Sequence, residues 1–252
     1  MQNKTIFITG ATAGFGQSCA RTFVKHGAKV IATGRRLERL KELKAELGSA
    51  LHIVPLDVQD EKTVQHTFAS LPPEFSTIDI LINNAGLALG LASFEKLSSA
   101  EIKQMIDTNI MGVMHCTHAV LPQMIKRDNG HIVNLGSIAG TYPYPGGNVY
   151  GATKAFIEQF SLNLRADLLG KNIRVTNIEP GMCDTEFSAV RFAGDTDKAK
   201  SVYAGMQALS AEDIANTIFW ALSQPKHVNI NRVEIMPVMQ AFSPFAVYRE
   251  KN

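Results

Sequence analysis

Short apolar runs alternate along the chain with longer segments in which apolar residues recur every three or four positions. The short runs predict β-strands, and the longer segments predict amphipathic helices. The predicted strands span residues 5–9, 29–33, 51–56, 78–82, 131–135, 173–178 and 233–236. The predicted helices span residues 14–26, 36–47, 61–71, 100–126, 149–168 and 211–223.

Several of the predicted strands are nearly continuous apolar runs. Runs such as Ile6-Phe7-Ile8 and Ile80-Leu81-Ile82 are typical of parallel strands that are covered on both faces. Right-handed crossovers between parallel strands then place helices on both sides of the sheet. The pattern therefore predicts an α/β fold, a Rossmann-type doubly wound parallel sheet of about seven strands with helices on both faces.

No internal repeat, low-complexity tract or linker interrupts this alternation, so we expect residues 1–252 to form a single domain. The least regular stretch spans residues 182–209, where Gly194-Asp195-Thr196-Asp197 breaks a mixed segment. A loop of this size in a compact domain is usually functional. We interpret it as a lid over a substrate.

The composition, with 45% hydrophobic and 19% charged residues, is that of an ordinary soluble globular protein, and it excludes disorder, collagen and coiled coil. The formal net charge is +2 and no run of like charges occurs, so a nucleic acid is not an expected partner. Three scattered cysteines, Cys19, Cys116 and Cys183, indicate a reducing compartment. Without a signal-peptide core or an apolar run of membrane-spanning length, we expect a cytoplasmic protein with no membrane partner.

The segment after the first predicted strand, Thr9-Gly10-Ala11-Thr12-Ala13-Gly14-Phe15-Gly16, is rich in glycine and leads into a helix. Glycines there allow the backbone to turn tightly and to approach a pyrophosphate, whose charge lies at the helix N-terminus. The spacing, G-x-x-x-G-x-G, departs from the usual G-x-G-x-x-G. A plain glycine-rich turn between a strand and a helix is the alternative.

The end of the second predicted strand indicates which dinucleotide such a loop would bind. An acidic residue there binds the 2′-hydroxyl of the adenosine ribose, whereas arginine accommodates a 2′-phosphate. This chain has Arg35 and Arg36 and no carboxylate at that place, which favours NADP. The alternative is that both arginines open a solvated helix. Asp57 would accept a hydrogen bond from the adenine amino group or cap the helix that follows.

Tyr150 and Lys154 are four positions apart in a predicted helix, so the phenol and the ammonium can approach the same point. A phenol has a reference pKa of about 10, and a fixed cation nearby lowers it. The pair alone is weak evidence, because any helix can carry it on a solvated face. Ser137, however, ends the fifth predicted strand at the carboxyl edge of the sheet, where such folds bind ligands.

His115 and His118 lie three positions apart in a predicted helix, with Cys116 between them, a spacing that could bind zinc. No carboxylate ligand or second cysteine pair accompanies them. We interpret these side chains as packing residues and expect no metal.

The motifs resemble, in order and spacing, those of the classical short-chain dehydrogenases/reductases over essentially the whole chain. The resemblance rests on Thr9 to Gly16, Asn83 to Gly86, Asn109, Ser137, Tyr150 with Lys154, and Pro180-Gly181. Taken alone, Asn109 and the amides that follow the fourth strand could equally be helix caps or core amides.

The family resemblance implies a catalytic tetrad of Asn109, Ser137, Tyr150 and Lys154. Tyr150 would act as general acid and base on the substrate oxygen, and Ser137 would orient that oxygen. Lys154 would hold the nicotinamide ribose and lower the pKa of Tyr150, while Asn109 would anchor a proton path through water. The residues implied to bind NADP are Gly10, Thr12, Gly14, Phe15, Gly16, Arg35, Arg36, Asp57, Val58, Asn84, Ala85, Gly86, Tyr150, Lys154, Pro180, Gly181 and Thr185.

A closer likeness lies in residues 33–36, 146–156, 179–181 and 185–187. These segments are similar to NADP-dependent 3-hydroxy acid dehydrogenases, which act on serine, allo-threonine and 3-hydroxypropionate and, in reverse, on malonic semialdehyde. Sulfoacetaldehyde reductases are the alternative. The resemblance also implies a homotetramer.

All of these substrates carry a small carbonyl or hydroxyl group near an anion, and an anion of that size favours a guanidinium. We therefore expect Ser137 and Tyr150 to bind the substrate oxygen and Arg191, in the lid, to bind the anion. Arg249, on the C-terminal tail, is a second candidate, which the tail would deliver to the site of a neighbouring subunit.

Two other functions use similar features. A non-enzymatic NADP-sensing module could have the same fold, because fold alone does not determine function, but a sensor has no need of the complete tetrad. A sugar epimerase shares the Tyr/Lys pair, but it needs a substrate domain and a longer chain than 252 residues.

Overall fold

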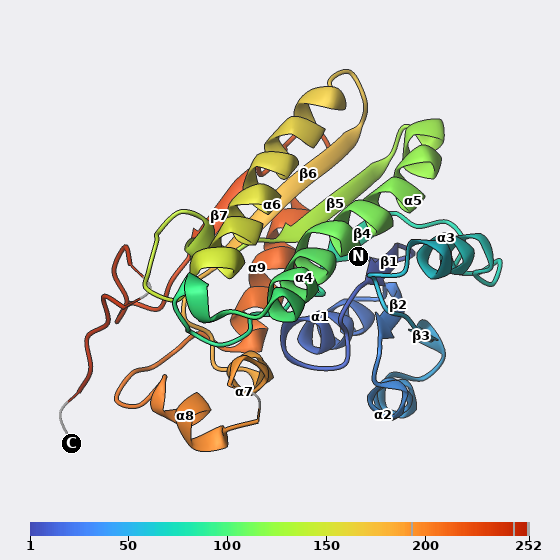
Figure 1. Cartoon of the computed structure of the whole chain (residues 1–252). Helices are drawn as coiled ribbons and strands as arrows, with labels where there is room; N and C mark the ends of the chain where they lie inside the picture. The colour runs from blue at the N-terminus through green and yellow to red at the C-terminus, as the bar shows by residue number, and fades with distance from the viewer. Residues whose placement is uncertain (193, 244, 251–252) are drawn as a thin grey trace.

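A sheet of seven parallel strands, in the order β3-β2-β1-β4-β5-β6-β7, runs through the computed structural model (Figure 1). The structure describes residues 1–192, 194–243 and 245–250. The strands are β1 (Thr5–Ile8), β2 (Lys29–Gly34), β3 (Leu51–Pro55), β4 (Ile80–Asn83), β5 (Gly130–Leu135), β6 (Ile173–Pro180) and β7 (Arg232–Ile235). Because the order reverses at β1 and β4, the predicted doubly wound sheet is confirmed.

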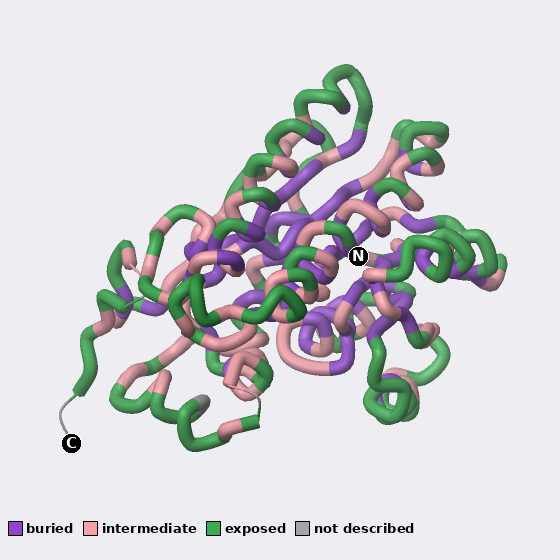
Figure 2. The backbone as a smooth tube through the Cα atoms, viewed as in Figure 1, coloured by how far each residue is buried: buried purple, intermediate pink, exposed green. Residues whose placement is uncertain are grey.

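Helices cover both faces of this sheet, and the strands appear in Figure 2 as a buried layer between more exposed helices. The helices of the described residues are α1 (Gly14–Lys25), α2 (Leu37–Leu47), α3 (Glu61–Ala69), α4 (Ser99–Ile106), α5 (Gly112–Arg127), α6 (Asn148–Asp167), α7 (Glu186–Arg191), α8 (Thr196–Ser201) and α9 (Ala211–Ser223), of which α7 and α8 lie away from the sheet (Figure 1). Successive strand residues point to opposite faces. Ile6 and Ile8 pack with side chains of α1, α2 and α9, whereas Phe7 packs with side chains of α3, α5 and α6. No helix in the described ranges is long and apolar enough to cross a membrane.

The helix predicted over residues 100–126 is confirmed, but a π-helical turn interrupts its α-helical hydrogen bonding. α4 ends at Ile106, a π-helical turn, η3 (Asp107–Met111), follows, and α5 begins at Gly112. Asn109 lies in this turn, almost fully buried, and its side chain hydrogen-bonds both backbone groups of Leu87. π-Turns inside helices often occur at functional sites, and this one brings a polar side chain into the interior.

Residues 182–209 are more regular than their sequence indicates, because they contain the short helices α7 and α8. Thr185 begins α7 by accepting a hydrogen bond from the Phe187 amide, and Asp195 begins α8 by accepting one from the Lys198 amide at 3.0 Å. Gly194, with a φ of 91°, turns the chain between the two helices.

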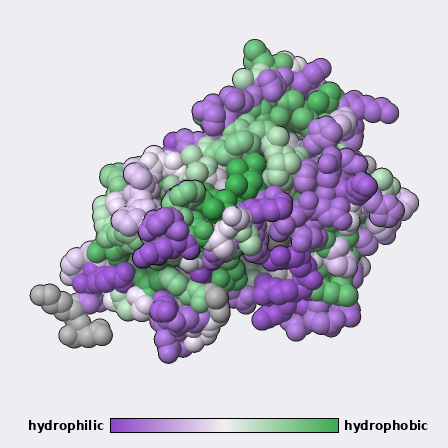
Figure 3. Space-filling view, in the orientation of Figure 1, coloured by the Kyte–Doolittle hydropathy of each residue, from purple (hydrophilic) through white to green (hydrophobic). Residues whose placement is uncertain are grey.

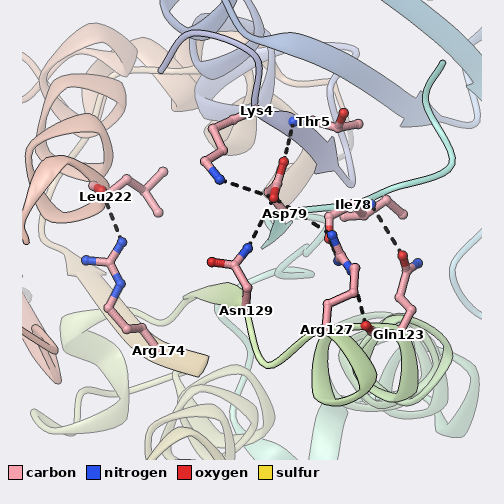
Figure 4. A network of polar contacts seen from close by, with 9 residues as sticks. All are labelled: Lys4, Thr5, Ile78, Asp79, Gln123, Arg127, Asn129, Arg174 and Leu222. Carbon is pink, nitrogen blue, oxygen red and sulfur yellow. Dashed lines mark hydrogen bonds and ion pairs between the residues drawn. The ribbon is translucent and has the colours of Figure 1, made fainter. Parts of the chain in front are cut away.

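The amino-terminal edge of the sheet is held together by the Asp79 carboxylate (Figure 4). It accepts hydrogen bonds from the Lys4 ammonium at 3.3 Å, the Thr5 amide at 3.1 Å and the Asn129 side chain at 3.2 Å. These partners lie at the starts of β1 and β5, next to the start of β4. The carboxylate therefore connects three neighbouring strands at the edge opposite their carboxyl ends.

We expect Asp79→Ala to lower the free energy of unfolding by roughly 1–3 kcal/mol, because the Thr5 amide loses its charged acceptor. Lys4→Ala should cost less than about 1 kcal/mol, since the Lys4 side chain is 40% exposed. Urea denaturation of both variants measures the difference. Equal losses for the two variants would show that the ion pair, and not the amide, is what Asp79 contributes.

Candidate active site

The carboxyl ends of the strands surround a cavity of about 560 Å³. Most of the residues predicted from the sequence to form a site lie on its wall. These residues are Gly10, Thr12, Gly14, Phe15, Arg35, Arg36, Asp57, Val58, Asn84, Ala85, Gly86, Ser137, Tyr150, Lys154, Pro180, Gly181, Thr185 and Arg191. Gly16 and Asn109, the two others, support the wall from behind.

The glycine-rich turn after β1 is shaped by close backbone contacts. Gly10 and Gly14 have φ values of 68° and 50°, in the left-handed region that favours glycine. A Cβ atom at Gly16 would lie 2.5 Å from the Gly10 carbonyl oxygen, so no larger residue fits there. The Asn84 amide donates to the carbonyl oxygens of Thr9 and Gly10, at 2.8 and 3.0 Å. Asn84 thus holds this turn in shape from the end of β4.

Helix α1 points its N-terminus at the cavity. Its N-cap residue, Ala13, has no capping side chain, and the first turn contains no acidic residue. The backbone N–H groups of that turn are therefore available to an anion, and the positive end of the helix dipole favours one. This arrangement fits a pyrophosphate group, as the sequence predicts.

Arg36 connects the glycine-rich turn to the lid. Its guanidinium donates to the Thr12 hydroxyl at 2.9 and 3.1 Å and to the Glu186 carboxylate at 3.0 Å. Arg35 and Arg36 are both exposed and both border the cavity at the end of β2. They thus lie at the place where the sequence predicts contact with the 2′-phosphate of NADP.

Asp57 borders the cavity after β3 and accepts a hydrogen bond from the Gln59 amide at 3.1 Å. The residue that caps α3 is Asp60, whose carboxylate accepts from the Thr63 amide. The alternative reading of Asp57 as a helix cap is therefore wrong. Nearby, the His115 Nδ1 donates a hydrogen bond to the Val58 carbonyl oxygen at 3.0 Å.

Within the described parts of the chain, no group of three or more His, Cys, Asp or Glu side chains is arranged to hold a metal ion.

Ser137, Tyr150 and Lys154 meet on one side of the cavity. Ser137 lies two residues after the end of β5, and its hydroxyl, beside the phenol, acts to lower the pKa of Tyr150. The Lys154 ammonium donates to the Leu135 carbonyl oxygen at 2.7 Å and lies 5.7 Å from the centre of the Tyr150 ring. The helix spacing and the strand end therefore bring these three side chains together as the sequence predicts.

Burial shifts the pKa values of Tyr150 and Lys154 in opposite directions. It raises the pKa of Tyr150 to about 12, an effect that the positive charge of Arg191 opposes. Burial lowers the pKa of Lys154 to about 8. The sequence assigned the lowering of the Tyr150 pKa to Lys154, whereas in the structure Arg191 is the cation that supplies it. The guanidinium carbon of Arg191 lies 5.3 Å from the centre of the Tyr150 ring.

Asn109 acts on the backbone behind the cavity wall. Its side-chain oxygen accepts from the Leu87 amide at 2.9 Å, and its nitrogen donates to the Leu87 carbonyl at 2.8 Å and to the Thr153 hydroxyl at 3.0 Å. A Cβ atom at Gly86 would lie 3.4 Å from the Asn109 oxygen and 3.6 Å from the Lys154 nitrogen. Asn109 thereby ties the segment after β4 to α6 beside Lys154.

Arg191 and Tyr144 form the end of the cavity beyond Tyr150. The guanidinium carbon of Arg191 lies 5.1 Å from the Phe187 ring centre. Burial raises the pKa of Tyr144, and the charge of Arg191 and a hydrogen bond from it oppose that rise. Sequence reasoning missed Tyr144, although its place between Pro143 and Pro145, in the segment that joins Ser137 to Tyr150, is a signal that could have found it.

Arg249 lines the same cavity. Its guanidinium donates to the carbonyl oxygens of Val202, at 2.9 Å, and Ala204. Within this chain, backbone acceptors of the lid therefore hold the Arg249 guanidinium. Phe245, also on the tail, packs edge-on against Tyr144 with ring centres 5.4 Å apart.

Comparison with known proteins gives consistent matches. The short chain dehydrogenase family model matches residues 4–195. Serine 3-dehydrogenase of Agrobacterium fabrum (strain C58) is 56% identical over 98% of this chain and 98% of its own length. NADP-dependent 3-hydroxy acid dehydrogenase YdfG of Escherichia coli (strain K12) is 54% identical over 97% of this chain and 99% of its own. A solved structure described as the closed form of serine dehydrogenase complexed with NADP+ has a TM-score of 0.94 and 54% identity, covering 98% of this chain and 100% of that one.

Replacing Arg35 and Arg36 together by alanine should weaken NADPH binding at least about 10-fold, because each charge-assisted hydrogen bond to a phosphate contributes about 1.5–3 kcal/mol. NADH binding should change less than about threefold, since NADH has no 2′-phosphate. The fluorescence of the bound nicotinamide measures both dissociation constants. Arg39→Ala is the matched control, because Arg39 is in the first turn of the helix that follows Arg35 and Arg36 and touches Glu186 at 3.7 Å. Equal losses for NADPH and NADH would mean that the pair does not recognise the phosphate.

Proposed function

The chain belongs to the short chain dehydrogenase family and is an NADP-dependent dehydrogenase, and we propose that it interconverts short 3-hydroxy acids and the corresponding 3-oxo acids or semialdehydes. Serine, allo-threonine and 3-hydroxypropionate are the proposed hydroxy acids. The observation that carries the proposal is one cavity wall on which the Ser137 and Tyr150 hydroxyls lie next to the Arg191 guanidinium. The names of the near full-length relatives support serine as a substrate and 3-hydroxy acids as the substrate class.

The cofactor cradle fits NADP. The glycine-rich turn and the first turn of α1 would hold the pyrophosphate, and Arg35 and Arg36 would hold the 2′-phosphate. Asp57, Val58 and Ala85 would border the adenosine, while Pro180, Gly181 and Thr185 would border the nicotinamide end. When bound, NADP+ accepts the hydride that leaves C3 of the hydroxy acid, and NADPH returns it in the reverse direction.

Tyr150 supplies the proton chemistry at the substrate oxygen. With a pKa raised by burial to about 12, its phenol is protonated at neutral pH and can donate to the carbonyl oxygen during reduction. In oxidation, the phenolate takes the proton of the substrate hydroxyl. Ser137 lies within hydrogen-bond reach of the same phenol, so its hydroxyl can bind the same substrate oxygen and orient it.

Lys154 and Asn109 complete the tetrad. One N–H of the Lys154 ammonium binds the Leu135 carbonyl, which leaves two for the hydroxyls of the nicotinamide ribose. Asn109 fixes the backbone of Gly86 and Leu87 beside Lys154 and would anchor a water-linked path for the proton.

Arg191 is the proposed partner of the substrate anion. Its guanidinium lies 5.3 Å from the Tyr150 ring centre, so a carboxylate held there leaves the carbonyl of a short 3-oxo acid beside the Tyr150 hydroxyl. The Tyr144 hydroxyl, whose pKa is affected by the charge of Arg191, offers a second donor to the same anion. A neutral aldehyde of equal length makes neither contact.

We also propose a homotetramer in the cytoplasm. Met111 in η3 and Phe156 and Leu162 in α6 expose 40, 38 and 46% of their surface, and Figure 3 shows apolar surface on this face over α5 and α6. Covering these side chains with another copy of the chain would remove apolar area from water. The three cysteines are free and buried, which fits a reducing compartment.

Tyr150→Phe should lower kcat for NADPH-dependent reduction of malonic semialdehyde by about 10²–10⁴-fold, the usual contribution of a general acid. The dissociation constant for NADPH should stay within about twofold, because the ring and the helix remain. Stopped-flow turnover and a fluorescence titration measure the two quantities. A variant that turns over as fast as the parent protein would refute the role of Tyr150.

Arg191→Met should lower kcat/KM for malonic semialdehyde by about 10–100-fold, because a charge-assisted hydrogen bond to the carboxylate is lost. The value for propanal, which has the same carbon chain without the carboxylate, should change less than about threefold. Tyr144→Phe should act in the same direction by a smaller factor. A loss on propanal as large as that on malonic semialdehyde would mean that Arg191 does not bind the anion.

A further inference from the structure

A cluster of four charged side chains lies behind the cavity, where β6 pairs with β7. The Arg232 guanidinium touches three carboxylates, those of Glu179 and Glu158 at 2.6 Å each and that of Glu234 at 3.3 Å. It also donates to the Thr141 hydroxyl at 2.7 Å. One side chain therefore holds groups from β6, α6, β7 and the segment after β5.

The partners of Arg232 belong to the segments that carry the proposed catalytic residues. Thr141 follows the short turn that begins at Ser137. Glu158 lies on α6, two helical turns after Tyr150 and on the same face, because residues four apart in a helix stack above one another. Arg232 thus bridges the helix of the phenol and the turn of the serine.

Lys154 occupies the intermediate position of the same helix face, one turn before Glu158. Glu179 directly precedes Pro180-Gly181, which would border the nicotinamide. The bridge therefore reaches α6, the Ser137 turn and the end of β6, three of the segments that would surround the reacting atoms, while Arg232 itself is not among the cavity-lining residues.

Glu179 anchors the bridge in the interior. It is 1% exposed, and the Asn177 amide donates to its other oxygen at 2.6 Å. Burial raises the pKa of Glu179 to about 7, and the charge of Arg232 opposes that rise. A Cβ atom at Gly136 would lie 3.0 Å from the Glu179 Cγ, so the backbone just before Ser137 packs directly on this side chain. A buried carboxylate without its cation is costly, so Glu179 keeps Arg232 in place.

We propose that Arg232 is a positioning residue for the reaction. Its bonds to Glu158 and Thr141 fix the position of α6 relative to the Ser137 turn. The proposal rests on the roles assigned above to Ser137 and Tyr150. An exposed ion pair contributes little to stability, but this guanidinium is fixed by a buried partner. We expect its loss to increase the separation of the Ser137 and Tyr150 hydroxyls. Small displacements of reacting groups lower the rate of the chemical step strongly.

Arg232→Gln should lower kcat for malonic semialdehyde reduction at least about 10-fold while the dissociation constant for NADPH changes less than about twofold. Arg232→Lys should recover only part of the rate, because an ammonium lacks the planar set of N–H donors with which the guanidinium contacts several partners at once. Arg21→Gln is the matched control, since it removes an arginine from an ion pair with Glu46 at 2.7 Å on the surface. The control should keep the parent kcat.

A second variant separates positioning from folding. Arg232→Gln leaves Glu179 buried without its cation, so its melting temperature should fall. Adding Glu179→Gln removes the unpaired charge, and the double variant should regain most of the melting temperature while kcat stays low. The proposal fails if kcat recovers together with the melting temperature, or if Arg232→Gln keeps the parent kcat. Tyr150→Phe assayed in parallel distinguishes the two proposals, because full activity of that variant overturns the proposed mechanism instead.

Discussion

The hydrogen bond from the buried Lys154 ammonium to the Leu135 carbonyl, 2.7 Å long, determines where α6 crosses the carboxyl end of β5. Tyr150 lies one helical turn before Lys154, and Ser137 lies two residues after Leu135. The contact therefore decides whether the two hydroxyls meet. Because its pKa is lowered only to about 8, Lys154 keeps its charge through most of the neutral range. The cofactor cradle, the lid and the anion end are arranged around this crossing.

In the parallel sheet, the contacts of Asp79 that join strands and the residues of the candidate site lie at opposite ends of the strands. Its amino-terminal edge is joined by Asp79, whose partners are the starts of strands. Its carboxyl edge supplies the glycine-rich turn, Ser137 and the segment after β6, because parallel strands end on the same side. The lid and the tail then enclose the cavity from outside, where Arg191 adds a positive charge and Arg249 joins the tail to the lid.

The sheet, the glycine-rich turn and the meeting of Ser137, Tyr150 and Lys154 follow from local pattern and spacing, and so the sequence predicts them. Contacts between distant segments do not follow from spacing. The π-turn at Asn109 depends on the Leu87 backbone, and the anchoring of Arg249 depends on acceptors in the lid. The Arg232 cluster depends on the pairing of β6 with β7. The sequence predicts Arg191 as an anion partner. Its effect on the pKa of Tyr150 could not be predicted, because it depends on where the lid places the guanidinium.

We propose that this dehydrogenase acts on a small carbonyl group that lies two carbons from a carboxylate. The most direct test is NADPH oxidation by the unaltered protein, with kcat/KM measured side by side for malonic semialdehyde and sulfoacetaldehyde, which differ chiefly in carboxylate against sulfonate. We predict a large preference for malonic semialdehyde. A preference for the sulfonate, or inactivity on both aldehydes, would contradict the proposed substrate class.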